Sequence, residues 1–110
     1  MQRLVGLEIA AKAQIRSAQT ANPGTGWTQL ADVNASQVIL YNNTGTTLRV
    51  AYCNPATGDD LTNQTYLTVA DGTVQPLRGI STAKQVKIKR DDESNTQVTA
   101  KYVLEDVATL

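Results

Sequence analysis

The chain has 110 residues and a mass of 11.8 kDa, with ten basic and ten acidic residues and no net charge. It contains no histidine and a single cysteine, which excludes imidazole-based catalysis, imidazole or thiolate zinc sites and an internal disulfide. The balanced charge argues against a general nucleic-acid binder, and we expect no enzyme activity, no cofactor and no metal ion.

The sequence also argues against a membrane protein. Its longest apolar stretches, such as residues 38–41, are far shorter than the roughly 20 residues that cross a bilayer. Glu8 interrupts the N-terminal apolar segment too early for a secretory signal, so we expect a protein made in the cytoplasm and not exported by that route.

Residues 4–16 alternate between apolar and polar side chains. The apolar side chains occupy odd positions: Val5, Leu7, Ile9, Ala11, Ala13 and Ile15. This period of two predicts a half-buried strand. A helix is the alternative, because alanine, lysine and glutamine favour it, but a helix would leave Val5 and Ile9 off its apolar stripe. We therefore expect residues 1–16 to form a long N-terminal strand or arm and residues 17–110 to form the body of one domain.

A loop is predicted over residues 17–26, where an Asn-Pro-Gly sequence and a second glycine favour turns. Trp27 follows it and begins a short alternating run. We interpret Trp27 as a core or sheet-edge anchor, with a stacking platform for a sugar or a partner as the alternative.

Residues 36–52 predict a hairpin, because two β-rich runs flank the turn sequence 42–45. Leu48, Val50 and Tyr52 share one face of the second strand. The first strand is apolar on both faces, which predicts a well-covered strand.

The next segment predicts a loop and a second hairpin. In the loop 53–64, Cys53 is interpreted as a half-buried small apolar residue, and Asp59-Asp60 as a solvated turn in preference to a metal site. Two short strands then flank a turn at 71–72, and Pro76 predicts either an edge position or the end of a strand.

A third hairpin is predicted over residues 84–105. Val86 and Ile88 should point inward on its first strand, and 98–104 should present alternate apolar residues on its second. The basic run 84–90 and the acids 91–93 cancel, which is typical of a solvated hairpin tip. A charge-paired contact with a partner is the alternative.

About seven or eight short strands with regularly spaced turns predict an all-β fold, an antiparallel β-sandwich. The pattern does not separate a jelly-roll order from an immunoglobulin-like one.

Two segments carry a resemblance to known proteins. Residues 38–50 (VILYNNTGTTLRV) and 86–92 (VKIKRDD) resemble small β-sandwich structural proteins of tailed bacteriophages, namely capsid decoration or cement proteins. The resemblance implies a non-enzymatic protein on the capsid exterior of a virion. It would bind the major capsid protein and copies of itself and would stabilise the head, with no nucleic acid, membrane or small molecule as partner.

Two alternatives to capsid decoration remain. One is a component of the tail, baseplate or head–tail junction. The other is a carbohydrate- or receptor-binding module with four candidate stacking residues: Trp27, Tyr41, Tyr52 and Tyr66.

The residues predicted to contact a partner come from the N-terminal alternation, the lone tryptophan and the basic strand. They are Val5, Leu7, Ile9, Ile15, Trp27, Lys87 and Lys89.

Overall fold

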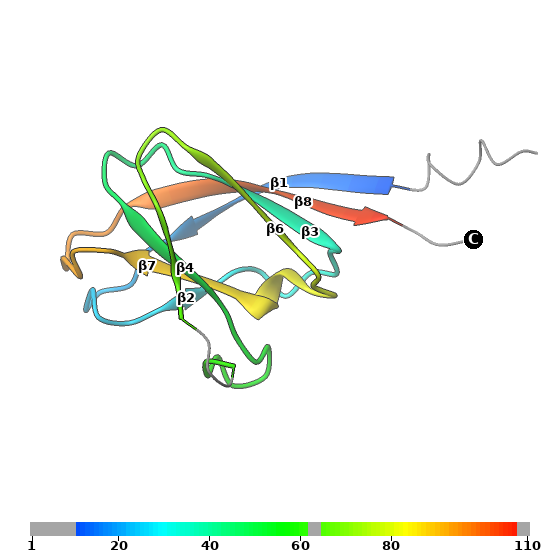
Figure 1. Ribbon diagram of the computed structural model, residues 1–110, viewed down its shortest axis with the longest axis horizontal. Helices are drawn as coiled ribbons and strands as arrows, with labels where there is room; N and C mark the ends of the chain where they lie inside the picture. Colours follow the sequence, from blue (N-terminus) through cyan, green and yellow to red (C-terminus); the bar gives the residue numbers. More distant parts are fainter. Residues whose placement is uncertain (1–10, 62–64, 108–110) are drawn as a thin grey trace, which may run out of the picture.

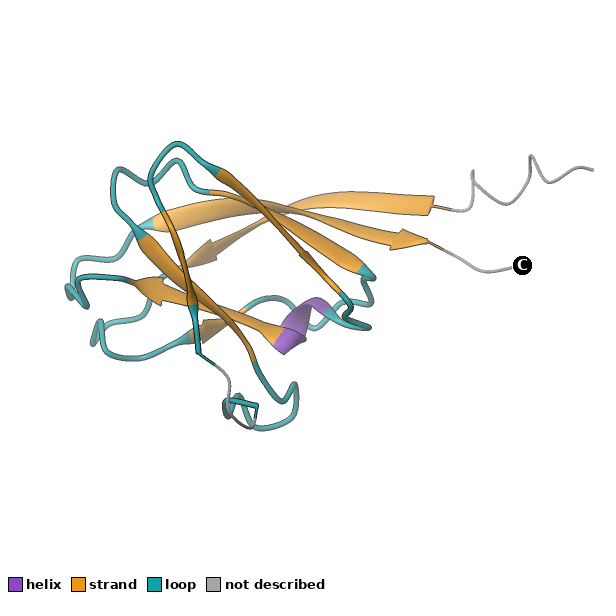
Figure 2. Ribbon diagram, viewed as in Figure 1, coloured by secondary structure: helices purple, strands orange, loops and turns teal. Residues whose placement is uncertain are grey.

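The computed structural model describes residues 11–61 and 65–107. Within these ranges the chain forms eight strands and one short 3-10 turn, η1 (Ala83–Gln85) (Figure 2). The strands are β1 (Ala11–Gln19), β2 (Thr28–Gln29), β3 (Gln37–Tyr41), β4 (Leu48–Tyr52), β5 (Leu67–Val69), β6 (Val74–Arg78), β7 (Val86–Arg90) and β8 (Thr99–Val107). The predicted all-β class is confirmed.

The strands form two four-stranded antiparallel sheets that face each other as a sandwich (Figure 1). Sheet A has the order β1-β8-β3-β6, and sheet B has the order β2-β7-β4-β5. The first strand therefore pairs with the last, the second with the seventh, the third with the sixth and the fourth with the fifth. The chain is one long hairpin, closed by the loop between β4 and β5 and rolled into two sheets, which is the jelly-roll order.

The three predicted hairpins are wrong in their pairing, although their strands exist. In each case the two strands belong to opposite sheets: β3 and β4, β5 and β6, and β7 and β8. The link after β3 crosses between sheets because Asn42 is buried there, and its side-chain amide donates to the carbonyls of Thr46 (2.8 Å) and Val69 (2.7 Å). A turn sequence shows where the chain reverses, but it does not show which sheet the next strand joins.

The core lies between the two inner faces. The predicted inward residues of β4 and β7 and those of the last strand are buried or packed against the core, which confirms the faces inferred from alternation. The largest fully buried apolar side chains are Tyr102, Leu40, Leu48, Ile88, Leu104, Val38, Val50 and Val86.

Strand β1 pairs with β8 along its whole length, from Ala11 opposite Val107 to Gln19 opposite Thr99. Figure 1 shows these two strands as a long pair that runs beyond the rest of the sheet. The predicted loop therefore begins after Gln19 rather than at residue 17, and the strand passes residue 16 without a break. Val5, Leu7 and Ile9 lie outside the described residues.

Pro76 lies in β6, at the edge of sheet A, so the predicted edge position is confirmed. An edge strand tolerates proline because the missing N–H would face away from the sheet. In the described part of the chain we find no helix with the length and apolar character needed to span a membrane.

Candidate interaction surface

The outer face of sheet A, the side turned away from the core, carries a row of apolar side chains. The strand register places Ile15, Val103, Ile39 and Pro76 next to one another across all four strands. We call these four residues the apolar row. Ile15 is 78% exposed, and the other three are exposed or half-buried.

Strand β1 places its apolar side on this outer face. Gln14 and Arg16 lie on the inner side of β1, where they pair with the buried Leu104 and Tyr102 of β8. Gln14 and Arg16 are nevertheless exposed. The Arg16 guanidinium donates to Gln14 Oε1 at 3.1 and 3.2 Å. The strand therefore turns its polar side toward the inner face and Ile15 toward solvent. A strand that packs only against the core of its own domain has the reverse arrangement, with apolar side chains inward and polar ones outward.

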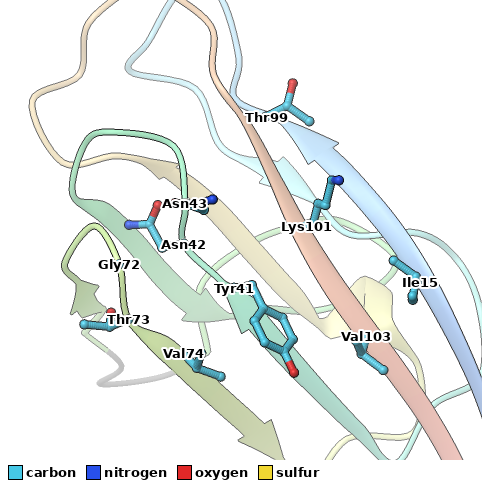
Figure 3. A pocket seen from close by; sticks show the side chains of 10 residues that line it. All are labelled: Ile15, Tyr41, Asn42, Asn43, Gly72, Thr73, Val74, Thr99, Lys101 and Val103. Carbon is cyan, nitrogen blue, oxygen red and sulfur yellow. The ribbon is translucent and has the colours of Figure 1, made fainter.

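A shallow groove of about 560 Å³ lies on the same face beside the apolar row (Figure 3). Tyr41 and Val74 extend its apolar lining, and both are exposed. Lys101 stands on β8 next to Tyr41 and Ser17, and it makes no ion pair with any residue of the described ranges. This combination of apolar walls and one unpaired cation is typical of a contact surface.

Polar side chains lie on the other side of the apolar row. Ala13, Glu105, Gln37 and Arg78 form the neighbouring row of the register. The amide of Gln37 donates to Glu105, and Arg78 Nε donates to Gln37 Oε1 at 2.7 Å. Glu105 has no ion pair in the part of the chain that the structure describes.

Of the predicted contact residues, Trp27, Lys87 and Lys89 come together on the outer face of sheet B. The two ammonium groups lie 4.7 and 4.9 Å from the centre of the Trp27 ring. Lys87 and Lys89 are 4% and 7% exposed, so the expectation of a solvated tip is wrong for them. The tryptophan ring lies against both ammonium groups, which contributes to the burial of the two side chains.

The charges of this cluster are neutralised within the chain. Lys87 pairs with Asp60 and donates to the Gly58 carbonyl at 3.0 Å, while Lys89 pairs with Glu93 at 2.7 Å. Arg49 lies beside these residues. It pairs with Asp91 (2.9 Å) and Glu93 (3.7 Å) and lies over the Tyr66 ring. We call the following set the cation cluster: Trp27, Arg49, Tyr66, Lys87, Lys89, Asp60, Asp91 and Glu93. Trp27 is not part of the core, and it directly precedes β2, the edge strand of sheet B. Of the two anchor positions predicted for it, the structure therefore favours the sheet edge over the core.

Cys53 is 1% exposed, more deeply buried than expected. Burial raises the pKa of its thiol, which keeps the sulfur in the unreactive protonated form. No cluster of three or more histidine, cysteine, aspartate or glutamate side chains suited to a metal ion occurs among the described residues.

The four candidate stacking aromatics do not share a surface. Tyr41 lies on the outer face of sheet A, whereas Trp27 and Tyr66 lie on the outer face of sheet B. The Tyr52 hydroxyl donates to the Arg78 carbonyl at 3.0 Å.

Sequence reasoning named Ile15 as a contact residue and Tyr41 as a candidate stacking residue, but it missed Ile39, Val74 and Val103. The signal was present in residues 38–41, which are apolar on both faces. We expected the chain to cover both faces of that strand, yet in the structure only Val38 and Leu40 are covered by the core.

No protein-family model matches the chain, and no curated protein matches it. Among solved structures it is similar to a chain from the Bacillus endospore appendages, which are described as a novel family of disulfide-linked pili. The likeness covers 90% of this chain and 88% of that chain, with 13% sequence identity and a TM-score of 0.53. At that identity the likeness shows a shared fold.

Proposed function

We propose that this chain is a non-enzymatic structural subunit, held in a larger protein assembly through the outer face of sheet A. The observation that carries the proposal is the orientation of β1, which turns Ile15 away from the core while its polar side faces inward. Removal of apolar surface from water contributes about 25 cal/mol per Å² of favourable free energy. Binding of another protein over this face would therefore be favourable.

The fold likeness to a chain described as part of disulfide-linked pili supports an assembly subunit, because a protein with a similar fold is part of a polymer. Disulfide linkage is not part of the proposal, because the single cysteine, Cys53, is buried. Capsid decoration stays the more specific form of the proposal, and it rests on the resemblance of the segments 38–50 and 86–92. In that form this chain binds only the assembled shell, and its binding stabilises the shell by mass action.

The test compares two exposed apolar residues on opposite sheets. Ile15→Ser removes a 78% exposed side chain from the apolar row, and Leu67→Ser removes a 50% exposed leucine from β5 in sheet B. We expect Ile15→Ser to lower association at least tenfold and Leu67→Ser to change it less than twofold.

Association would be measured by sedimentation and electron microscopy of the purified chain at rising concentration. The capsid form adds a mixture with undecorated shells from the virus that encodes the chain. Equal effects of the two variants would contradict the proposed surface. Failure of the chain to form or join any assembly would contradict the function.

A further inference from the structure

We propose that the outer face of sheet A binds the same face of a second copy of this chain across a two-fold axis that runs along the apolar row. This proposal rests on the proposed function, because it names the partner of the same face. Its central feature is an intermolecular ion pair between Lys101 of each copy and Glu105 of the other.

The register of β8 sets the geometry. Lys101, Val103 and Glu105 are successive outward positions of one strand, so each charge lies about 7 Å from Val103 along the strand, on opposite sides of it. A two-fold axis along the apolar row reverses the strand direction and keeps each strand over its own copy. The row then meets itself, and Lys101 meets Glu105 of the second copy twice.

The neighbouring rows are complementary under the same operation. Tyr41 faces Gln37 of the second copy, and Val74 faces the stem of Arg78, because each pair lies two residues apart on its strand on either side of the apolar row. An isologous contact of this kind closes on itself as a dimer.

Charge distinguishes this axis from the other two-fold arrangement of the same face. An axis parallel to the strands would exchange β8 with β3, and it would place Lys101 over Tyr41 and Glu105 over Gln37. In that arrangement neither charge directly faces an opposite charge. The proposed axis pairs them, and neither has an ion pair with any residue in the described ranges.

The size of the face indicates a weak dimer. Four strands spaced about 4.8 Å apart and five residues long span an area well under the 800 Å² or so per partner of a standard interface. Aligned sheets also pack about 30° apart, so the corners diverge and the centre near Val103 makes the closest contact. The measurement therefore needs protein concentrations up to the millimolar range.

Reversal of the two charges tests the pairing. Lys101→Glu places like charges together twice in the homodimer, and so does Glu105→Lys. We expect each single variant to weaken dimerisation about tenfold or more, measured by sedimentation equilibrium. The double variant restores both opposite-charge contacts, and we expect its dissociation constant to lie within about threefold of the wild type.

A mixture of the two single variants gives the more specific test of the ion pairing. A heterodimer of Lys101→Glu with Glu105→Lys pairs opposite charges at both positions, so an equimolar mixture should dimerise like the wild type although each component alone does not. Asp59→Lys is the matched control, because it reverses an exposed charge in the loop outside both sheets. Glu105→Gln serves in place of Glu105→Lys if the lysine variant fails to fold, and it should weaken dimerisation by less than Lys101→Glu does, because it removes an opposite charge without adding a like one.

A wild-type chain that stays monomeric at millimolar concentration overturns the dimer, and so does a mixture that fails to recover association. If Ile15→Ser abolishes entry into an assembly while the charge reversals have no effect, the face binds a different protein. The two-fold proposal then fails and the proposed function stands. If the charge reversals behave as expected but the dimer joins no larger assembly, the proposed function fails instead.

Discussion

At the scale of single residues, a close approach between two loops depends on Gly24. Its backbone N–H donates to Asn95 Oδ1 at 2.9 Å, and a Cβ atom on Gly24 would lie 2.0 Å from the Ser94 carbonyl oxygen and 2.4 Å from that of Glu93. Both contacts are with backbone, which cannot rotate away. The loop after β1 therefore fits the loop after β7 only when this residue is glycine.

Gly24→Ala should destabilise the fold by about 2–3 kcal/mol, the cost of an overpacked site. The free energy of unfolding would be measured by urea denaturation followed by Trp27 fluorescence. Gly26→Ala is the control from the same loop, because its Cβ would meet the nearest atom at 3.3 Å, and it should cost less than about 1 kcal/mol. Equal losses for the two variants would contradict the close contact.

A second residue-scale prediction concerns pH. The hydrogen bond from Lys89 and its charge hold the pKa of Glu93 below its usual value of 4.5. Because the folded pKa is the lower one, the stabilisation is present above pH 4.5 and is lost as the pH falls through the folded pKa. Urea midpoints of the wild type should therefore fall more steeply with decreasing pH below 4.5 than those of Glu93→Gln. Parallel curves would contradict this role of the ion pair.

At the scale of elements, alternation predicted strands and faces but not partners. Leu48 and Val50 on β4, and Ala100 and Tyr102 on β8, are buried as the period of two requires. The partners were wrong because a short link such as 42–47 serves equally to turn within a sheet or to cross to the opposite one. The pairing of β3 with β6 and β8 depends on residues far away in the chain, which no local signal encodes.

Only part of the candidate surface could be predicted from the sequence, because alternation is a local signal and side-chain burial is not. Ile15 was found because β1 shows a clear alternation. Lys87 and Lys89 were expected to be solvated because lysine usually is. Their burial depends on Trp27, more than fifty residues away in sequence, so only the folded sheet brings the ring over them.

The cation cluster leads to a prediction that separates stability from association. Trp27→Ala should lower the free energy of unfolding by about 2 kcal/mol, because two buried cations lose the ring that they contact. It should leave self-association unchanged, because Trp27 lies on sheet B. Unfolding would be followed by circular dichroism, since Trp27 is the single tryptophan.

Tyr66→Ala is the matched control for Trp27→Ala. Its ring also contacts a cation, Arg49 at 4.6 Å, but Tyr66 is 44% exposed and contacts one cation where Trp27 contacts two. We expect a loss of less than about 1 kcal/mol for this variant. A Trp27→Ala protein that folds as stably as the wild type but no longer associates would instead make Trp27 a contact residue.

At the scale of the whole molecule, the first and last strands, β1 and β8, have unequal roles. β8 lies between β1 and β3 inside sheet A, whereas β1 is an edge strand that pairs with β8 alone. A chain that ends at residue 98 should therefore fail to fold. A chain that begins at residue 20 should keep its sandwich with reduced stability, and it should not associate, because Ile15 is gone. Circular dichroism and sedimentation would check both, and a folded chain without β8 would contradict this assignment.

Salt should separate the two forces that act on the outer face of sheet A. Burial of the apolar row does not depend on charge, and sulfate strengthens it. The Lys101–Glu105 contacts lie toward the rim, where the screening length shrinks from about 10 Å at 0.1 M salt to about 3 Å at 1 M. Lys101→Glu should raise the dissociation constant of the dimer relative to the wild type. We therefore expect that ratio to shrink at least threefold when sodium chloride rises from about 0.1 M to about 1 M. The defect of Ile15→Ser should stay constant over that range, and both would be measured by sedimentation equilibrium. If the two defects changed together, a single surface with an apolar centre and paired charges would not describe this face.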